Sequence, residues 1–148
     1  KGKAYNLGKG VNKKREEAYR ELLRPLNLGL EDKLHVKVGS LSGGQRQAAS
    51  LLMATIAEPE LLLLDEHTAA LDPGAAEKVM ALTKKIVEEN KITTLMITHD
   101  MEYALEYGSR TIMLDSGKIV MDLTGKEREE MTTGKLAELF YGKAHKKG

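Results

Sequence analysis

A run of four leucines at positions 61–64 ends abruptly in Asp65 and Glu66, and this stretch constrains the fold more than any other. A short apolar run bounded by charge is typical of a fully buried strand, although periodicity alone does not separate it from a buried helix segment. Pro59 favours the strand, because a helix through this region would lose a backbone donor there. Open α/β sheets bind ligands at the carboxyl ends of their strands. We therefore expect two carboxylates at such an edge, where they could hold a metal ion and an activated water.

Composition narrows the class of protein. With 148 residues, 41% of them hydrophobic, the chain is long enough for one domain with a real core. The 23 Lys and Arg nearly balance the 22 Asp and Glu, which gives no general drive towards nucleic acid or an anionic membrane. The absence of cysteine excludes disulfides and thiolate chemistry. No apolar run approaches the ~20 residues that span a bilayer. There is no signal-peptide pattern and no initiator Met, so we expect a fragment or a processed chain.

A helix and a second strand follow the leucine run. Asp72 and Pro73 predict the start of a helix that reaches about residue 90. Its core stripe is predicted at Val79, Leu82 and Ile86. Residues 93–98 are β-branched and apolar and lead into His99, which predicts a strand with a polar group at its carboxyl end. Strand, helix and strand in this order indicate a parallel sheet with a right-handed crossover.

The remaining elements are shorter. Ser116-Gly117 predicts a two-residue hairpin turn between two strands. We predict these strands at 110–115 and 118–123, and helices at 12–23 (capped by Asn12), 101–107 and 126–140, the last interrupted near 132–134. The tail, residues 143–147, is predicted to be solvated.

Residues 42–57 predict a further helix with Ser42 as its N-cap. The second half is apolar nearly all round, so we expect this helix to be buried. Gly43 and Gly44 each cost about 1 kcal/mol relative to alanine in a helix. Two explanations remain open: bare backbone N–H groups that bind an anion at the helix start, or glycines that permit tight packing.

Together, Asp65 and Glu66 after one strand and His99 after the next form a credible site. Four segments then resemble the motifs of ABC-type ATPases, in the family's order: the signature motif, the Walker B strand, the D-loop and the switch-histidine loop. They lie at 41–47 (Leu-Ser-Gly-Gly-Gln-Arg-Gln), 61–66, 70–72 and 97–100. The resemblance covers about residues 12–140. It implies an α/β, P-loop NTPase-like (RecA-like) parallel sheet core, incomplete, with residues 1–57 as a partial helical signature subdomain and 58–148 as the carboxyl-terminal part of the core.

The resemblance also implies roles for individual residues. Asp65 would hold Mg²⁺, Glu66 would act as general base on the attacking water, and His99 would contact the γ-phosphate of ATP. Asp72 would couple the two sites of a dimer. The signature residues would bind ATP held by the opposite subunit: Ser42, Gly43, Gly44 and Gln45.

Two departures from the family pattern stand out. His67 occupies a position where the family usually has proline; it could add a titrating group beside the site, or be purely structural. The Walker A loop and the glutamine-bearing loop are not recognised in this chain. Residues 2–10 mimic a Walker A loop, but five residues rather than four separate Gly2 from Gly8-Lys9, and Gly10 occupies the hydroxyl position. We therefore expect this chain to resemble the carboxyl-terminal portion of the ATPase and to bind ATP poorly on its own.

The resemblance favours the ATP-hydrolysing subunit of an ABC membrane transporter. Its partners would be a transmembrane permease subunit and a second ATPase subunit in a head-to-tail dimer, without nucleic acid, on the cytoplasmic face of the membrane as a peripheral protein. The alternatives are a soluble ABC ATPase acting on nucleic acid or ribosomes, and a non-catalytic interaction module. The transported substrate and the direction of transport are not encoded in this stretch.

Overall fold

The computed structural model describes residues 13–144. The predicted Asn12 cap, the glycine- and lysine-rich start and the end of the tail therefore lie outside the described residues. Within them, the chain forms two compact units. Residues 13–62 and 67–94 belong to the first, and 63–66 and 95–144 to the second. The predicted division after residue 57 stays a prediction.

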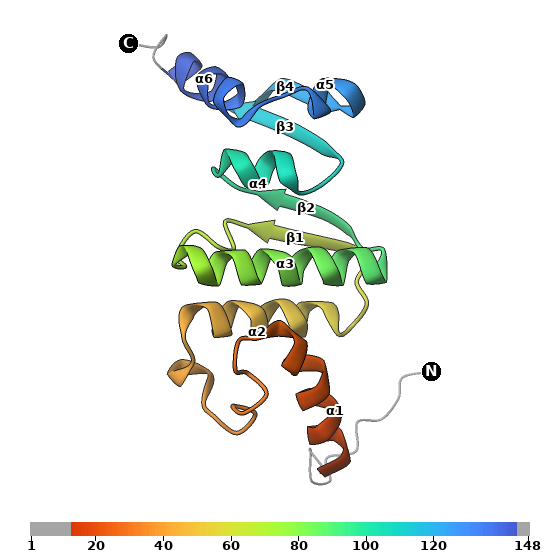
Figure 1. The fold of residues 1–148 in the computed structure, drawn as a ribbon. Coiled ribbons are helices and arrows are strands. Elements are labelled where there is room, and N and C mark those ends of the chain that lie inside the picture. Colours follow the sequence, from red (N-terminus) through yellow and green to blue (C-terminus); the bar gives the residue numbers. More distant parts are fainter. Residues whose placement is uncertain (1–12, 145–148) are drawn as a thin grey trace. The chain divides into compact units, whose positions relative to one another are not determined.

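The first unit is mainly helical. Its helices are α1 (Lys13–Leu23), η1 (Arg24–Leu26), η2 (Val38–Ser40), α2 (Gly43–Thr55) and α3 (Pro73–Asn90). Helices α2 and α3 lie side by side (Figure 1). Ala48 of α2 is buried. The residues of the stripe predicted for α3 are buried as well, which confirms that stripe: Val79, Leu82 and Ile86.

Helix α2 is buried on one side only. Met53 is 70% exposed and Ile56, just after the helix, is 64% exposed. The prediction of a helix buried all round is therefore wrong within the described residues. The reason is that α3 packs against the face carrying Gly44, Ala48 and Leu51, whereas nothing in the described part of the chain covers the opposite face.

Strands β1 (Leu61–Asp65) and β2 (Thr93–Ile97) form a two-stranded sheet. The backbone N–H of Glu66 donates to the carbonyl oxygen of Ile97 at 3.0 Å. The carboxyl ends of both strands therefore meet, and the strands run parallel, as the sequence predicts. The full burial expected for the leucine run is wrong: Leu62 is buried, but Leu61 and Leu63 are 54% and 65% exposed. Successive side chains of a strand face opposite sides, and the described residues cover only the side of Leu62.

The second unit contains α4 (Met101–Glu106), β3 (Arg110–Asp115), β4 (Lys118–Thr124), α5 (Gly125–Glu129) and α6 (Thr133–Ala144). Strands β3 and β4 pair antiparallel, with a bulge between Met113 and Leu114. Ser116 and Gly117 have φ of 51° and 74°, the pair of left-handed conformations that a type I′ hairpin turn requires. The predicted hairpin is confirmed. The last predicted helix is interrupted as expected, but at residues 130–132 rather than 132–134.

Candidate functional site

The amino end of α2 is closed by a reciprocal cap. The backbone N–H of Gln45 donates to Ser42 Oγ at 3.3 Å, and the backbone N–H of Ser42 donates to Gln45 Oε1 at 3.1 Å. This capping box satisfies two backbone donors at the same helix end. It confirms Ser42 as the N-cap of α2, which begins at Gly43.

Both glycines at this helix end are in tight surroundings. A Cβ atom added at Gly44 would lie 3.0 Å from Cβ of Ala75, and one at Gly43 would lie 3.1 Å from Cδ2 of Leu71. Ala75 is part of α3, so Gly44 allows the two helix ends to approach closely. The packing explanation therefore accounts for Gly44, while anion binding by the α2 amides stays a prediction.

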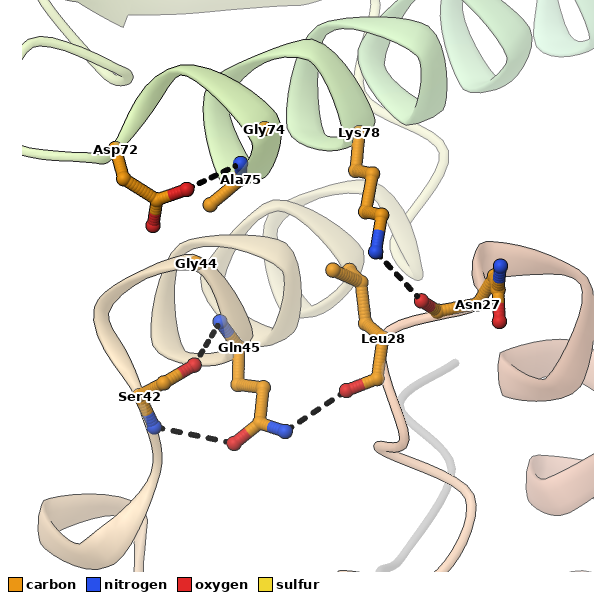
Figure 2. Close-up of a pocket in the computed structure, with 9 residues that line it drawn as sticks. All are labelled: Asn27, Leu28, Ser42, Gly44, Gln45, Asp72, Gly74, Ala75 and Lys78. Carbon is orange, nitrogen blue, oxygen red and sulfur yellow. Dashed lines mark hydrogen bonds between the residues drawn. The ribbon is translucent and has the colours of Figure 1, made fainter.

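A pocket of about 350 Å³ lies where the amino ends of α2 and α3 meet the turn at Asn27 and Leu28 (Figure 2). The carboxylate of Asp72 caps α3 by accepting a hydrogen bond from the backbone N–H of Ala75 at 3.0 Å. Asp72 is thereby confirmed as an N-cap. The structure brings together in this pocket four of the residues singled out from the sequence: Ser42, Gly44, Gln45 and Asp72.

The carboxamide of Gln45 forms hydrogen bonds to other residues of this chain (Figure 2). Besides the Ser42 N–H, its Oε1 accepts from Lys33 Nζ at 2.9 Å, and its Nε2 donates to the carbonyl oxygen of Leu28 at 2.8 Å. Sequence reasoning missed Lys33, Leu28 and the nearby Lys78, whose Nζ lies 3.4 Å from the carbonyl oxygen of Asn27. No motif spacing identifies these residues; only the folded chain brings them together.

Glu66 and His99 meet at the carboxyl ends of β1 and β2. Nδ1 of His99 lies 2.7 Å from Oε2 of Glu66, and their side chains are 68% and 37% exposed. Because an ionised carboxylate only accepts, Nδ1 carries the hydrogen of this bond. Glu66 has φ of 47°, a left-handed conformation that costs a non-glycine residue about 1–2 kcal/mol. Its N–H bond to Ile97 and its side-chain bond to His99 both hold it there.

Asp65, the last residue of β1, is exposed. Among residues 13–144, no group of three or more His, Asp or Glu side chains is arranged to hold a metal ion. Mg²⁺, however, is usually held by one or two carboxylates together with waters and phosphate oxygens. The open carboxylate of Asp65, followed directly by Glu66, fits that donor set.

His67 contacts helix α3 of the first unit. Its Nε2 lies 3.2 Å from Oγ1 of Thr83, whose own hydroxyl donates to the carbonyl oxygen of Val79 at 2.8 Å. His67 Nε2 is therefore the donor in this pair. Burial lowers the pKa of His67, which favours the neutral ring. These contacts agree with a structural side chain.

Within the described residues, no helix is both long enough and apolar enough to cross a membrane.

Comparison with known proteins identifies relatives along nearly the whole chain. A family model described as "ABC transporter" matches residues 4–69. The tyrosine transport ATP-binding protein of Clostridioides difficile is 49% identical over 140 residues, which cover 95% of this chain and 55% of that protein.

Two solved structures show the same fold. The ADP conformation of MJ1267, an ATP-binding cassette of an ABC transporter, is 25% identical with a TM-score of 0.66, covering 93% of this chain and 54% of that chain. The dimeric post-hydrolysis state of the cassette MJ0796, bound to ADP and Pi, is 33% identical with a TM-score of 0.59, covering 78% of this chain and 50% of that one. The chain is therefore similar to ABC transporter ATP-binding proteins along nearly its whole length, has their P-loop NTPase type of α/β fold, and spans about half the length of the relatives it matches.

Proposed function

We propose that the whole protein is the ATP-hydrolysing subunit of an ABC membrane transporter. The observation that carries this proposal is the Glu66–His99 pair, 2.7 Å apart where two parallel strands end. ATP hydrolysis needs a base for the attacking water and a group that fixes the γ-phosphate. The pair offers both, and the similarity to ABC transporter ATP-binding proteins supports these roles.

In the proposed mechanism, Glu66 takes the proton from the attacking water. Its Oε2 is occupied by His99 Nδ1–H, so Oε1 faces the water, and Nε2 of His99 addresses the γ-phosphate. A positioned general base contributes typically ~10²–10⁴ in rate. Asp65 would hold Mg²⁺, which, when bound, neutralises charge on the phosphate oxygens.

We also propose that a second ATPase subunit completes the site. Ser42, together with the Gly43, Gly44 and Gln45 residues of the signature motif, would face the γ-phosphate side of ATP held by that subunit. Asp72, which lines the same pocket as Ser42, would couple the two sites. The dimeric structure of the similar cassette MJ0796 supports a dimer, for which we propose a head-to-tail arrangement.

The remaining partners follow from the same proposal. A transmembrane permease subunit would anchor the dimer peripherally at the cytoplasmic face of the membrane. The near balance of 23 basic and 22 acidic residues supports the absence of a nucleic-acid partner. The 148-residue chain by itself would bind ATP weakly, because no Gly-x-x-x-x-Gly-Lys-Ser/Thr sequence occurs in it.

The test is phosphate release from ATP by the whole protein with Mg²⁺, alone and with its permease. The proposal expects turnover that depends on Glu66. Absence of turnover in both preparations would instead favour a non-catalytic interaction module. Equilibrium dialysis of ATP against the 148-residue chain checks the weak binding separately.

A further inference from the structure

Lys33 contributes a charged donor to the cap of α2. Its Nζ lies 2.9 Å from Gln45 Oε1, and both residues are partly buried within the first unit. The start of its side chain is fixed by a turn, since the backbone N–H of Lys33 donates to Leu30 at 3.0 Å and its carbonyl accepts from Val36 at 2.9 Å. The backbone that carries this ammonium group is therefore held in place by two hydrogen bonds.

This contact decides which way the Gln45 carboxamide faces. The two donors, Lys33 Nζ and the Ser42 N–H, both require an oxygen, and the Leu28 carbonyl requires an N–H. A flipped carboxamide would place its NH₂ group against an ammonium and a backbone N–H. Lys33 also polarises the carboxamide, because a bond from a charged donor is stronger than one between neutral groups. Figure 2 shows the result on the Ser42 side: the carboxamide bridges the Ser42 backbone and Leu28.

We propose that Lys33 is a positioning residue for Ser42. By fixing the Gln45 carboxamide, it holds the Ser42 backbone and hydroxyl in the capping box, the geometry in which Ser42 would present its hydroxyl to a nucleotide phosphate. The functional part of this inference rests on the proposed ATPase activity. Lys33 itself touches neither nucleotide nor water in the reaction.

The first test measures amide hydrogen exchange of the Ser42 N–H by NMR in the whole protein. Lys33→Met removes the ammonium and keeps a long unbranched side chain. Loss of one charge-assisted bond near the surface should speed exchange at Ser42 by about 3- to 10-fold. Lys33→Arg, which retains a charged donor, should restore most of the protection.

Lys37→Met is the matched control, since it removes the same charge from an exposed lysine of the same segment. It should leave the exchange of Ser42 unchanged. The proposal is overturned if Lys33→Met and Lys37→Met give the same exchange rate at Ser42.

The second test measures kcat and KM for ATP in the whole protein. Misplacement of Ser42 should raise KM about 3- to 10-fold in Lys33→Met, with a smaller change in kcat. A merely structural defect would lower kcat in proportion to the misfolded fraction and leave KM unchanged, which would overturn the functional part. A wild-type protein without turnover would overturn the proposed ATPase function, whereas the exchange comparison still decides whether Lys33 positions Ser42.

Discussion

Nδ1 of His99 lies 2.7 Å from Oε2 of Glu66, although the two residues are 33 positions apart in the sequence. Their meeting follows from the parallel pairing of β1 and β2, which brings both strand ends to one edge of the sheet. The bond uses one carboxylate oxygen and leaves the other available, which is the arrangement expected of a base that must be oriented while it accepts a proton.

The first prediction concerns Glu66→Gln. The amide oxygen can still accept from His99 Nδ1–H, so the local geometry should survive, but the side chain no longer takes a proton from water. ATP turnover of the whole protein should fall by about 10²–10⁴, with ATP binding retained. Steady-state phosphate release and equilibrium nucleotide binding, measured on the same preparation, check both halves of the expectation.

Glu60→Gln provides the control, because Glu60 is an exposed glutamate directly before β1. It should keep wild-type turnover. A Glu66→Gln variant as active as Glu60→Gln would rule out Glu66 as the general base.

The second prediction concerns the contact between Gly44 and Ala75. A methyl group at position 44 would meet Cβ of Ala75 at 3.0 Å, tighter than most real Cβ contacts, so Ala75 would have to shift by a few tenths of an ångström. Overpacking of this kind costs about 1–3 kcal/mol, against a gain of about 1 kcal/mol from the better helix propensity of alanine. Gly44→Ala should therefore lower the free energy of unfolding, measured by urea denaturation, by up to about 2 kcal/mol.

Gly134→Ala is a matched control, because Gly134 is likewise the second residue of its helix, α6, and an added Cβ would have nothing within 4 Å. It should be neutral or stabilising. The double variant Gly44→Ala, Ala75→Gly should recover part of the loss through relief of the contact, and a purely additive result would contradict the steric explanation.

Features decided by local chemistry could be predicted from the sequence. Ser42 and Asp72 cap their helices because a short polar side chain before a helix satisfies orphan backbone donors wherever the helix lies. Ser116-Gly117 turns the hairpin because Gly117 adopts the left-handed conformation without steric cost. The meeting of Glu66 and His99 could also be predicted, since a parallel sheet aligns strand ends by topology alone.

Features decided by distant neighbours could not be predicted. The leucine run predicts uniform burial. Leu63 is nevertheless 65% exposed, because the described residues cover only the side of β1 that carries Leu62. No sequence pattern identifies Lys33, because its role depends on a hydrogen bond to Gln45, 12 positions later, that only the folded chain forms. The two explanations for Gly44 were equally good in sequence terms, and the position of Ala75 on another helix was needed to show that packing operates.

The third prediction tests the cap of α3. Asp72→Ala removes the acceptor for the Ala75 N–H and should reduce the free energy of unfolding by about 1 kcal/mol. Asp72→Asn keeps a capping oxygen and should lose much less. Urea denaturation at neutral pH compares the three proteins, and equal losses in both variants would mean that the carboxylate charge, rather than the cap, stabilises this helix end.

The fourth prediction concerns pH and the hairpin. Arg110 donates from Nε and from Nη2 to the two carboxylate oxygens of Asp122, and these hydrogen bonds lower the pKa of Asp122 from its ordinary value of 3.8. A lowered folded-state pKa means that the unfolded chain binds the proton more readily. The pair therefore contributes its full stability above the unfolded value, and that contribution is lost as the pH falls through the folded value.

Asp122→Asn should accordingly lower the urea midpoint at neutral pH, and the difference from wild type should shrink as the pH drops below 3.8. The effect is small because both side chains are exposed and screened by solvent. Glu129→Gln, which removes an exposed carboxylate from the neighbouring helix α5, is measured at each pH as the control for the loss of one negative charge. If the Asp122→Asn difference stays constant down to about pH 2, the Arg110–Asp122 pair does not shift the titration of the folded protein, since the protonated carboxyl would then be as stabilising as the ionised one.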